Sequence, residues 1–122
     1  AFVYKYEIMK VDRFEDIIAW QKAKHLTKEI YILFNDCRDF CFRDQIKRAS
    51  ISIMNNIAEG FERMSNKELK YFLFVAKGSC GEVRSMLILA MELNLIEEKQ
   101  AKELYLLSEE ISKILSGFIK TL

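Results

Sequence analysis

The sequence predicts an all-α protein, an up-down-up-down antiparallel four-helix bundle that assembles into a ring oligomer. The 122 residues include no proline and four glycines, and 51% of them are hydrophobic. This composition lacks helix breakers and supplies few of the turns that a sheet needs. In addition, four long segments carry apolar residues at alternating spacings of three and four, which is typical of amphipathic helices packed into a bundle.

The length is that of a single domain with a sizeable core of its own. We expect residues 14–122 to form the four-helix bundle domain and residues 1–13 to be an N-terminal tail or arm. Met9 opens a segment that is typical of a natural start. Residues 1–8 are therefore interpreted either as an extension ahead of that start or as a short strand-like arm.

The first helix is predicted from Phe14 to about Asp36. Apolar residues recur in it at spacings of 4-3-4-3, a pattern that matches one face of a helix. The members of this stripe are Ala19, Ala23, Leu26, Ile30 and Leu33. Polar residues between positions 35 and 39 then indicate a short loop.

The second helix is predicted from about Phe42 to Glu62, and it is unusually apolar. One face carries Ile46, Ala49, Ile53, Ile57 and Gly60. Further apolar residues widen this face to an arc of roughly 200° at about 100° per residue. These residues are Ile51, Met54, Ala58 and Phe61. Asn56 lies at the edge of the arc, either hydrogen-bonded or half exposed. Asn55 lies on the polar side with Ser52 and is expected to be solvated or at the rim of a contact.

The third helix begins at a capping box, because Ser65 is followed three residues later by Glu68. It is predicted to continue to about Leu95. Its core stripe consists of Leu69, Phe72, Leu73, Ala76, Cys80, Val83, Leu87 and Ala90. A second apolar set lies well away from that stripe and consists of Tyr71, Val75, Met86, Leu89 and Leu93.

The fourth helix follows Asn94 and the Glu97-Glu98 pair and runs to the end of the chain. Its apolar positions keep a 3-4-3-4-3-4 spacing, as in coiled coils. They are Ala101, Leu104, Ser108, Ile111, Leu115, Phe118 and Leu122.

The extra apolar surface on the second and third helices predicts self-association. A helix that is apolar nearly all round is buried nearly all round, which a four-helix monomer cannot achieve. The residues expected at a contact between subunits are Ile51, Met54, Ala58, Val75, Met86 and Leu89. Gly60 has two interpretations: it removes a Cβ where another backbone approaches, or it is the C-cap of the second helix.

The charge is nearly balanced, with 19 Lys and Arg against 18 Asp and Glu. There is thus no global field like that of a strongly basic nucleic-acid binder, and any basic patch must be local. The two candidate nucleic-acid groups are Arg43, Lys47 and Arg48, and Arg63, Lys67 and Lys70. They are expected at opposite ends of the second helix, and a ring would repeat each of them. Since acidic residues are interleaved with them, solvated surface faces remain the alternative.

The sequence offers no arrangement for catalysis, a metal or a cofactor. A di-iron bundle needs Glu-x-x-His pairs, and the single histidine, His25, is preceded at that spacing by Lys22. Cys37, Cys41 and Cys80 are an odd number without a companion His, so we expect reduced thiols and a cytoplasmic protein. No apolar run is long enough for a membrane span. Glu59 is expected to pair with Arg63 rather than to act as an acid or base.

Three segments resemble a known family. They are FEDIIAWQKA at residues 14–23, DQIKRASISIMNNIAEGFERMSNKEL at 44–69 and FLFVAKGSCGEVRSMLILAMELNLI at 72–96. This pattern is similar to the four-helix bundle proteins encoded within 23S rRNA intervening sequences, and the similarity covers about residues 12–120. Members often have a proline near the position of Met54, so its absence removes a kink from the second helix.

The resemblance implies a left-handed bundle that assembles into a ring, with a homopentamer favoured. It also implies a relationship to the accessory variability proteins of diversity-generating retroelements, which are basic pentamers that bind nucleic acid and a reverse transcriptase. Two functions therefore remain open at the level of the sequence. One is a non-enzymatic, oligomeric accessory protein that binds RNA or DNA weakly, and the other is a protein-interaction scaffold, for example a reverse-transcriptase partner, that does not contact nucleic acid.

Overall fold

Four long helices make up residues 11–122, the part of the chain that the computed structural model describes. They are α2 (Ile18–Leu33), α3 (Phe40–Glu62), α4 (Asn66–Glu92) and α5 (Glu98–Lys120), preceded by the 3-10 turn η1 (Phe14–Asp16). The described residues contain no strand, and the predicted all-α class with four helices is confirmed. The strand-like arm expected for residues 1–8, and most of the tail at 1–13, lie outside the described residues.

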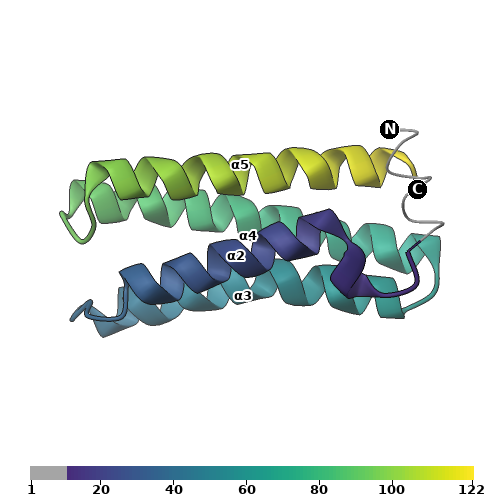
Figure 1. The fold of residues 1–122 in the computed structure, drawn as a ribbon, viewed down its shortest axis with the longest axis horizontal. Helices are drawn as coiled ribbons and strands as arrows, with labels where there is room; N and C mark the ends of the chain where they lie inside the picture. Colours follow the sequence, from purple (N-terminus) through teal and green to yellow (C-terminus); the bar gives the residue numbers. More distant parts are fainter. Residues whose placement is uncertain (1–10) are drawn as a thin grey trace.

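The helices lie side by side along the long axis of the molecule (Figure 1). The α2–α3 and α4–α5 connections are at one end of this view, and the α3–α4 connection is at the opposite end. Each helix packs against the next one in the chain, and α2 also packs against α5, which closes the bundle. The α3–α4 contact is the most extensive and the α2–α5 contact is the least extensive among the helix pairs.

The core consists mainly of the aliphatic stripes that the sequence predicts. Burying one such side chain stabilises the fold by about 1.5 to 3 kcal/mol. The largest fully buried side chains are Phe34, Leu26, Ile30, Ile46, Ile53, Ile57, Leu73, Leu87, Ile111 and Leu115. All four helices contribute to this set, so one continuous core lies along the bundle axis.

Small hydroxyl side chains connect each pair of successive helices. Thr27 of α2 donates to the carbonyl oxygen of Ser50 in α3 at 3.1 Å, and Ser108 of α5 donates to the carbonyl oxygen of Cys80 in α4 at 3.0 Å. Between α3 and α4, the hydroxyl oxygens of Ser52 and Ser79 lie 2.9 Å apart. The expectation that Ser52 belongs to a solvated polar side is therefore wrong, because Ser52 is half-buried at the α3–α4 contact.

Asn56 is hydrogen-bonded, which was one of the two alternatives for this residue. Its Nδ2 donates to the carbonyl oxygen of Ser52 at 2.7 Å and to the Ser52 hydroxyl at 2.9 Å. The amide thus holds the Ser52 side chain in place beside α4. Asn55 is exposed, as expected.

The chain enters α2 later than predicted. The predicted start at Phe14 is wrong, because Ile17 has an extended backbone (φ −75°, ψ 121°) that separates η1 from α2. This conformation places the Ile17 side chain in the core, where it is 6% exposed. Gln21 Nε2 donates to the carbonyl oxygen of Glu15 at 2.9 Å and thereby links the two segments.

Two side chains cap helix N-termini. The Asp39 carboxylate accepts from the backbone N–H of Phe42 at 3.1 Å, and α3 accordingly begins at Phe40, two residues earlier than predicted. The Ser65 hydroxyl accepts from the backbone N–H of Glu68 at 3.4 Å, which confirms the predicted cap of α4. Each bond satisfies one of the free donors in a first helical turn.

Left-handed residues end α3 and α4. Asn94 has φ 58°, and the N–H of the next residue, Leu95, donates to the carbonyl oxygen of Ala90 at 2.9 Å. This is a Schellman motif, and it ends α4 at Glu92 rather than at the predicted Leu95. The corresponding residue after α3 is Met64, with φ 60°. Its side chain is 88% exposed, so no core contact of the described residues offsets the backbone strain.

Gly60 lies inside α3 and is buried, so the C-cap interpretation is wrong. A Cβ at this position would lie 2.8 Å from the Cβ of Phe72 and 3.2 Å from Cδ1 of Leu69, both on α4. Gly60 therefore permits a close approach of two helices, as the other interpretation required. The approaching helix belongs to the same chain, however, and not to a neighbouring subunit.

Candidate nucleic-acid interface

The first predicted basic group lies in the first turns of α3. Arg43 Nε is 3.1 Å from an Asp44 carboxylate oxygen, and its guanidinium lies 4.8 Å from the centre of the Phe40 ring. Lys47 Nζ lies 4.6 Å from the centre of the Tyr31 ring on α2. Arg48 is exposed but lies about 100° further round the helix than Lys47. These three cations therefore do not form one compact patch within a single chain.

The second predicted group lies around the α3–α4 connection. Arg63 is the C-cap of α3, and its guanidinium is 2.8 Å from the Glu59 carboxylate and 3.6 Å from that of Glu68. The predicted Glu59–Arg63 pair is thus confirmed, and the hydrogen bond to Glu59 raises the pKa of Arg63. Lys67 and Lys70 are exposed. Neither lysine has a carboxylate within ion-pair distance among residues 11–122.

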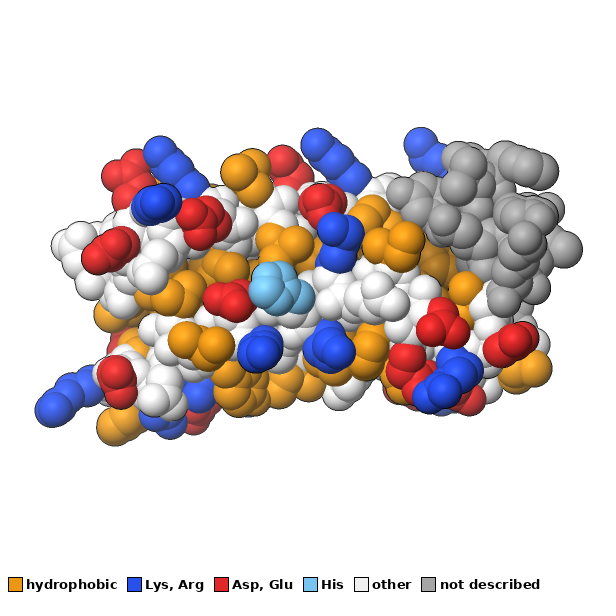
Figure 2. All heavy atoms as spheres, viewed as in Figure 1, with side chains coloured by type: hydrophobic (Ala, Val, Ile, Leu, Met, Phe, Trp, Pro, Cys, Tyr) orange, Lys and Arg blue, Asp and Glu red, His pale blue; other side chains and the backbone are white. Residues whose placement is uncertain are grey.

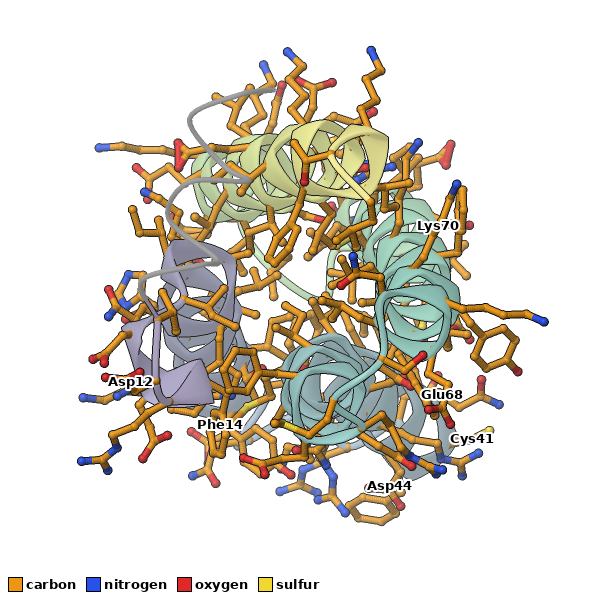
Figure 3. The ribbon with its side chains drawn as sticks, turned by 90° about the vertical axis from the view of Figure 1, so that its right-hand side faces the viewer. Asp12, Phe14, Cys41, Asp44, Glu68 and Lys70 are labelled. Atoms are coloured by element: carbon orange, nitrogen blue, oxygen red, sulfur yellow. The ribbon has the colours of Figure 1, made fainter. Side chains whose placement is uncertain are left out.

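The end-on view separates the charges at the start of α4 (Figure 3). Lys70 lies on the side of α4 nearer α5, whereas Glu68 lies on the side nearer α3. Lys70, Lys77 and Arg84 follow one another at intervals of seven residues. Seven residues are close to two helical turns, so these three cations share one side of α4.

The α5-facing side of α4 forms one wall of an open groove with a volume of about 600 Å³. The cations along this groove are Lys77 and Arg84 of α4 and Lys113 and Lys120 of α5. Among residues 11–122, Glu109 is the one acidic residue that lines the groove, and its carboxylate is 3.9 Å from Lys113 Nζ. We call this the α4–α5 groove, lined by Lys77, Arg84, Tyr105, Glu109, Ser112, Lys113, Ser116, Gly117 and Lys120.

Arg84 is held in place by α5. Its guanidinium donates to the carbonyl oxygen of Ser108 at 3.3 Å and to the Ser108 hydroxyl at 3.4 Å. Ser108 itself is buried and donates to Cys80. Since a guanidinium has five N–H donors, Arg84 keeps donors for a ligand while its orientation is fixed.

The α4–α5 groove was not predicted from the sequence, because basic residues were grouped only within contiguous segments of the chain. The groove takes its cations from two helices, and Lys77 and Lys113 are far apart in the chain. The signal was present as a seven-residue interval, in Lys70, Lys77 and Arg84 on one helix and in Lys113 and Lys120 on the other. Positions seven apart on two neighbouring antiparallel helices can line a common groove.

Charges of both signs alternate on the face drawn in Figure 2, and hydrophobic side chains are exposed between them. Such a mixed face has no strong field of one sign. This agrees with the nearly balanced composition. The α4–α5 groove differs from this face, because four cations and one carboxylate from residues 11–122 line it.

The residues predicted at a subunit contact differ in exposure. Val75 and Leu89 on the outer side of α4 are exposed, at 36% and 45%. Met54 and Met86 are half-buried and pack partly against the core of their own chain. Ile51 and Ala58 are also half-buried. The outer side of α4 further exposes Tyr71, Phe74 and Leu93.

Gly78 lies on the same outer side of α4 and is exposed. A Cβ at this position would have no heavy atom of residues 11–122 within 4 Å. Nothing in this part of the chain therefore requires a glycine here, in contrast to Gly60. The outer side of α4 thus combines exposed apolar side chains with a position where the backbone itself is accessible.

The remaining candidate residues show no arrangement for chemistry. His25 and Cys41 are exposed, and burial raises the pKa of the Cys80 thiol to about 12, which keeps it protonated at neutral pH. Within residues 11–122, no group of His, Cys, Asp and Glu side chains is placed to hold a metal ion. No helix in the described part of the chain has the length and apolar character needed to cross a membrane.

The fold and these surfaces define the class of protein. It is an all-α four-helix bundle with a basic groove and an apolar outer helix face. The family model of the 23S rRNA-intervening sequence protein matches residues 15–117. Because this match covers most of the chain, the protein belongs to that family, and the resemblance found in the sequence is confirmed.

A solved structure has the same fold. It is a protein with unknown function from the S23 ribosomal protein family of Bacteroides thetaiotaomicron VPI-5482. It superposes with a TM-score of 0.79 at 26% sequence identity, over 84% of this chain and 99% of that chain. No curated protein matches the sequence. Neither the family description nor that of the solved relative names an enzymatic activity.

Proposed function

We propose that this protein is a non-enzymatic, oligomeric accessory protein that binds RNA or DNA weakly and without sequence preference. The unit is an up-down-up-down bundle, and the assembly is a cytoplasmic ring, for which the family resemblance favours five subunits. The observation that carries the proposal is the α4–α5 groove, in which four cations face one carboxylate. Contacts between cations and phosphates supply most of the affinity of non-specific binding to nucleic acid.

Repetition in a ring compensates for the small number of cations in each groove. A single groove offers only a few phosphate contacts, which give weak binding. When several grooves contact one strand, the later contacts become intramolecular and the overall affinity rises without new contacts. The predicted groups at Arg43, Lys47 and Arg48, and at Lys67 and Lys70, are additional cations on the same repeated unit.

The outer side of α4 supports the oligomeric part of the proposal. Val75 and Leu89 expose apolar surface that an isolated chain leaves in water. Ile51, Met54 and Ala58 lie on a different helix. Contact between two different surfaces is heterologous, and a heterologous contact closes into a ring when its rotation permits.

Binding of labelled single-stranded RNA and DNA, followed by fluorescence anisotropy across a series of salt concentrations, tests the proposal. We expect the logarithm of the affinity to fall linearly with the logarithm of the salt concentration, with the same slope for unrelated sequences. Absence of binding at low salt would instead favour the protein-interaction scaffold, for example a partner of a reverse transcriptase. Replacing Arg43, Lys47 and Arg48 together by Ala should lower the affinity and flatten the slope if this group also contacts phosphates.

A further inference from the structure

The spacing of two packed helices limits the width of the α4–α5 groove. Two packed helices have axes about 8 to 10 Å apart, and a groove between them is narrower than the major groove of a duplex, which is itself about 12 Å wide. A duplex would therefore contact only the rims of the α4–α5 groove. A single strand can place its phosphates between the walls.

The cations are spaced along both walls of this groove. Lys77 and Arg84 are seven residues apart on α4, as are Lys113 and Lys120 on α5. At about 1.5 Å per residue, each pair spans roughly 10 Å. Lys77 and Lys113 are partly or largely exposed and carry flexible stems, so they can reach successive phosphates, whereas Arg84 is fixed by Ser108.

Tyr105 is the aromatic residue that lines the α4–α5 groove among the described residues. It is half-buried and packs against the core, so its orientation is restricted. Tyr105 also lines an adjoining apolar slot together with Leu87, Ile88 and Met91. A fixed aromatic ring beside a row of cations is the combination by which proteins bind single strands without reading their sequence, because every base has a face that can stack.

We propose that the α4–α5 groove binds a single-stranded segment, with Lys77, Arg84, Lys113 and Lys120 on its phosphates and Tyr105 stacked on one base. This inference rests on the proposed nucleic-acid binding and names the strand form and the residues. Ser112 and Ser116 add hydroxyl groups that can donate to phosphate or sugar oxygens.

The experiment compares a labelled single strand with a duplex of the same sequence. For the Lys77→Gln/Lys113→Gln variant we expect at least about tenfold weaker binding of the single strand. The salt slope should become smaller by about 1.4 for each groove that the strand contacts, which corresponds to two lost contacts per groove. Lys28→Gln/Lys99→Gln is the matched control, because it removes the same charge from exposed positions outside the groove. This control should change the affinity less than about twofold, and the duplex should bind more weakly than the single strand.

Tyr105 is tested separately. Tyr105→Leu should weaken single-strand binding by about 5- to 100-fold, whereas Tyr105→Phe, which keeps the ring, should retain it. Circular dichroism and thermal unfolding establish that each variant is folded. If Tyr105→Leu does not fold, the Lys77→Gln/Lys113→Gln variant still tests the proposal.

The possible failures are distinguishable. If the unmodified protein binds neither strand form at low salt, the proposed function itself is wrong. If it binds, but the duplex binds as tightly as the single strand or the Lys77/Lys113 variant behaves like its control, nucleic-acid binding stands and the assignment of the α4–α5 groove is overturned.

Discussion

The hydroxyl oxygens of Ser52 and Ser79 lie 2.9 Å apart at the contact between α3 and α4. Ser79 is buried, and Ser52 also accepts a hydrogen bond from Asn56. A shift of either helix by one residue would separate the two hydroxyls and leave a buried polar group without its partner. The pair therefore fixes the register of the most extensive helix contact in the molecule.

Replacement of either serine by alanine should destabilise the fold. We expect Ser79→Ala to lower the free energy of unfolding by about 1 kcal/mol, because Ser52 then loses its partner on α4. The Ser52→Ala/Ser79→Ala double variant should lose less than the sum of the two single changes, since the residues interact directly. Urea unfolding of the three variants measures this coupling, and strictly additive losses would show that the contact contributes nothing.

Gly60 and Gly78 form a matched pair, because both lie inside helices and only one is packed. Gly60→Ala should destabilise the protein by about 1 to 3 kcal/mol, since the new Cβ would meet Phe72 across a rigid contact between α3 and α4. Gly78→Ala should stabilise the isolated chain by up to about 1 kcal/mol through helix propensity alone. Thermal unfolding distinguishes the two, and a stabilising Gly60→Ala would contradict the close approach.

Met64 is strained in its left-handed conformation and has an exposed side chain. Met64→Gly should therefore raise the free energy of unfolding by about 1 kcal/mol, because glycine adopts this conformation without a Cβ penalty. Met64→Leu, which keeps the Cβ, should change stability by less than about 0.5 kcal/mol. Chemical unfolding of both variants provides the comparison, and equal stabilities would exclude strain at this residue.

The buried Cys80 thiol predicts a pH dependence. Burial raises its pKa from the ordinary value of 9.0 to about 12 in the folded chain. Below pH 9 the thiol is protonated in both states, whereas between pH 9 and 12 the unfolded chain releases the proton first. The Cys80 contribution to stability should therefore be lost as the pH rises, by up to about 1.4 kcal/mol per pH unit. Urea unfolding of the unmodified protein and of Cys80→Ala at several pH values between 9 and 12 measures how steeply the free energy of unfolding of each falls with pH.

Thiol labelling provides an independent check on Cys80. Cys41 is exposed and should react at once with an aromatic disulfide reagent, whereas Cys80 should react only when the chain unfolds. Rapid labelling of all three cysteines in the folded protein would contradict this assignment.

The outer side of α4 should determine the oligomeric state. Leu89→Asp should release species smaller than the native assembly, because it places a charge in an apolar contact between subunits. The fold of each chain should tolerate this charge, since Leu89 is exposed within the chain. Met54→Asp should also release smaller species, and circular dichroism checks that this variant folds, because Met54 packs partly against the core of its own chain. Leu106→Asp on α5 is the control, since Leu106 is exposed but lies outside the predicted contact. Light scattering reads the mass, and a monodisperse 14.4 kDa species for the unmodified protein would show that no such contact exists.

The helices and their buried stripes could be predicted because each depends on local spacing within one segment. The start of α2 could not, since the extended Ile17 is stabilised by burial in a core made by other segments. The partner of Gly60 could not be assigned for a related reason: a missing Cβ indicates a close approach without indicating whether the approaching helix is in the same chain. The α4–α5 groove depends on which helices are neighbours, so its cations can be grouped only once the packing is known.

The least extensive helix contact, between α2 and α5, also has a consequence for the order of folding. Among the described helix pairs, α2–α5 is the contact between the first and the last long helix in the chain, and it includes the Lys22–Glu110 ion pair at 2.7 Å. The other three helix pairs are neighbours in the chain, so most of the native contacts require only short loops to close. Proteins of such low contact order fold in microseconds to milliseconds. We therefore expect the α3–α4 hairpin to organise the transition state and the α2–α5 seam to close last.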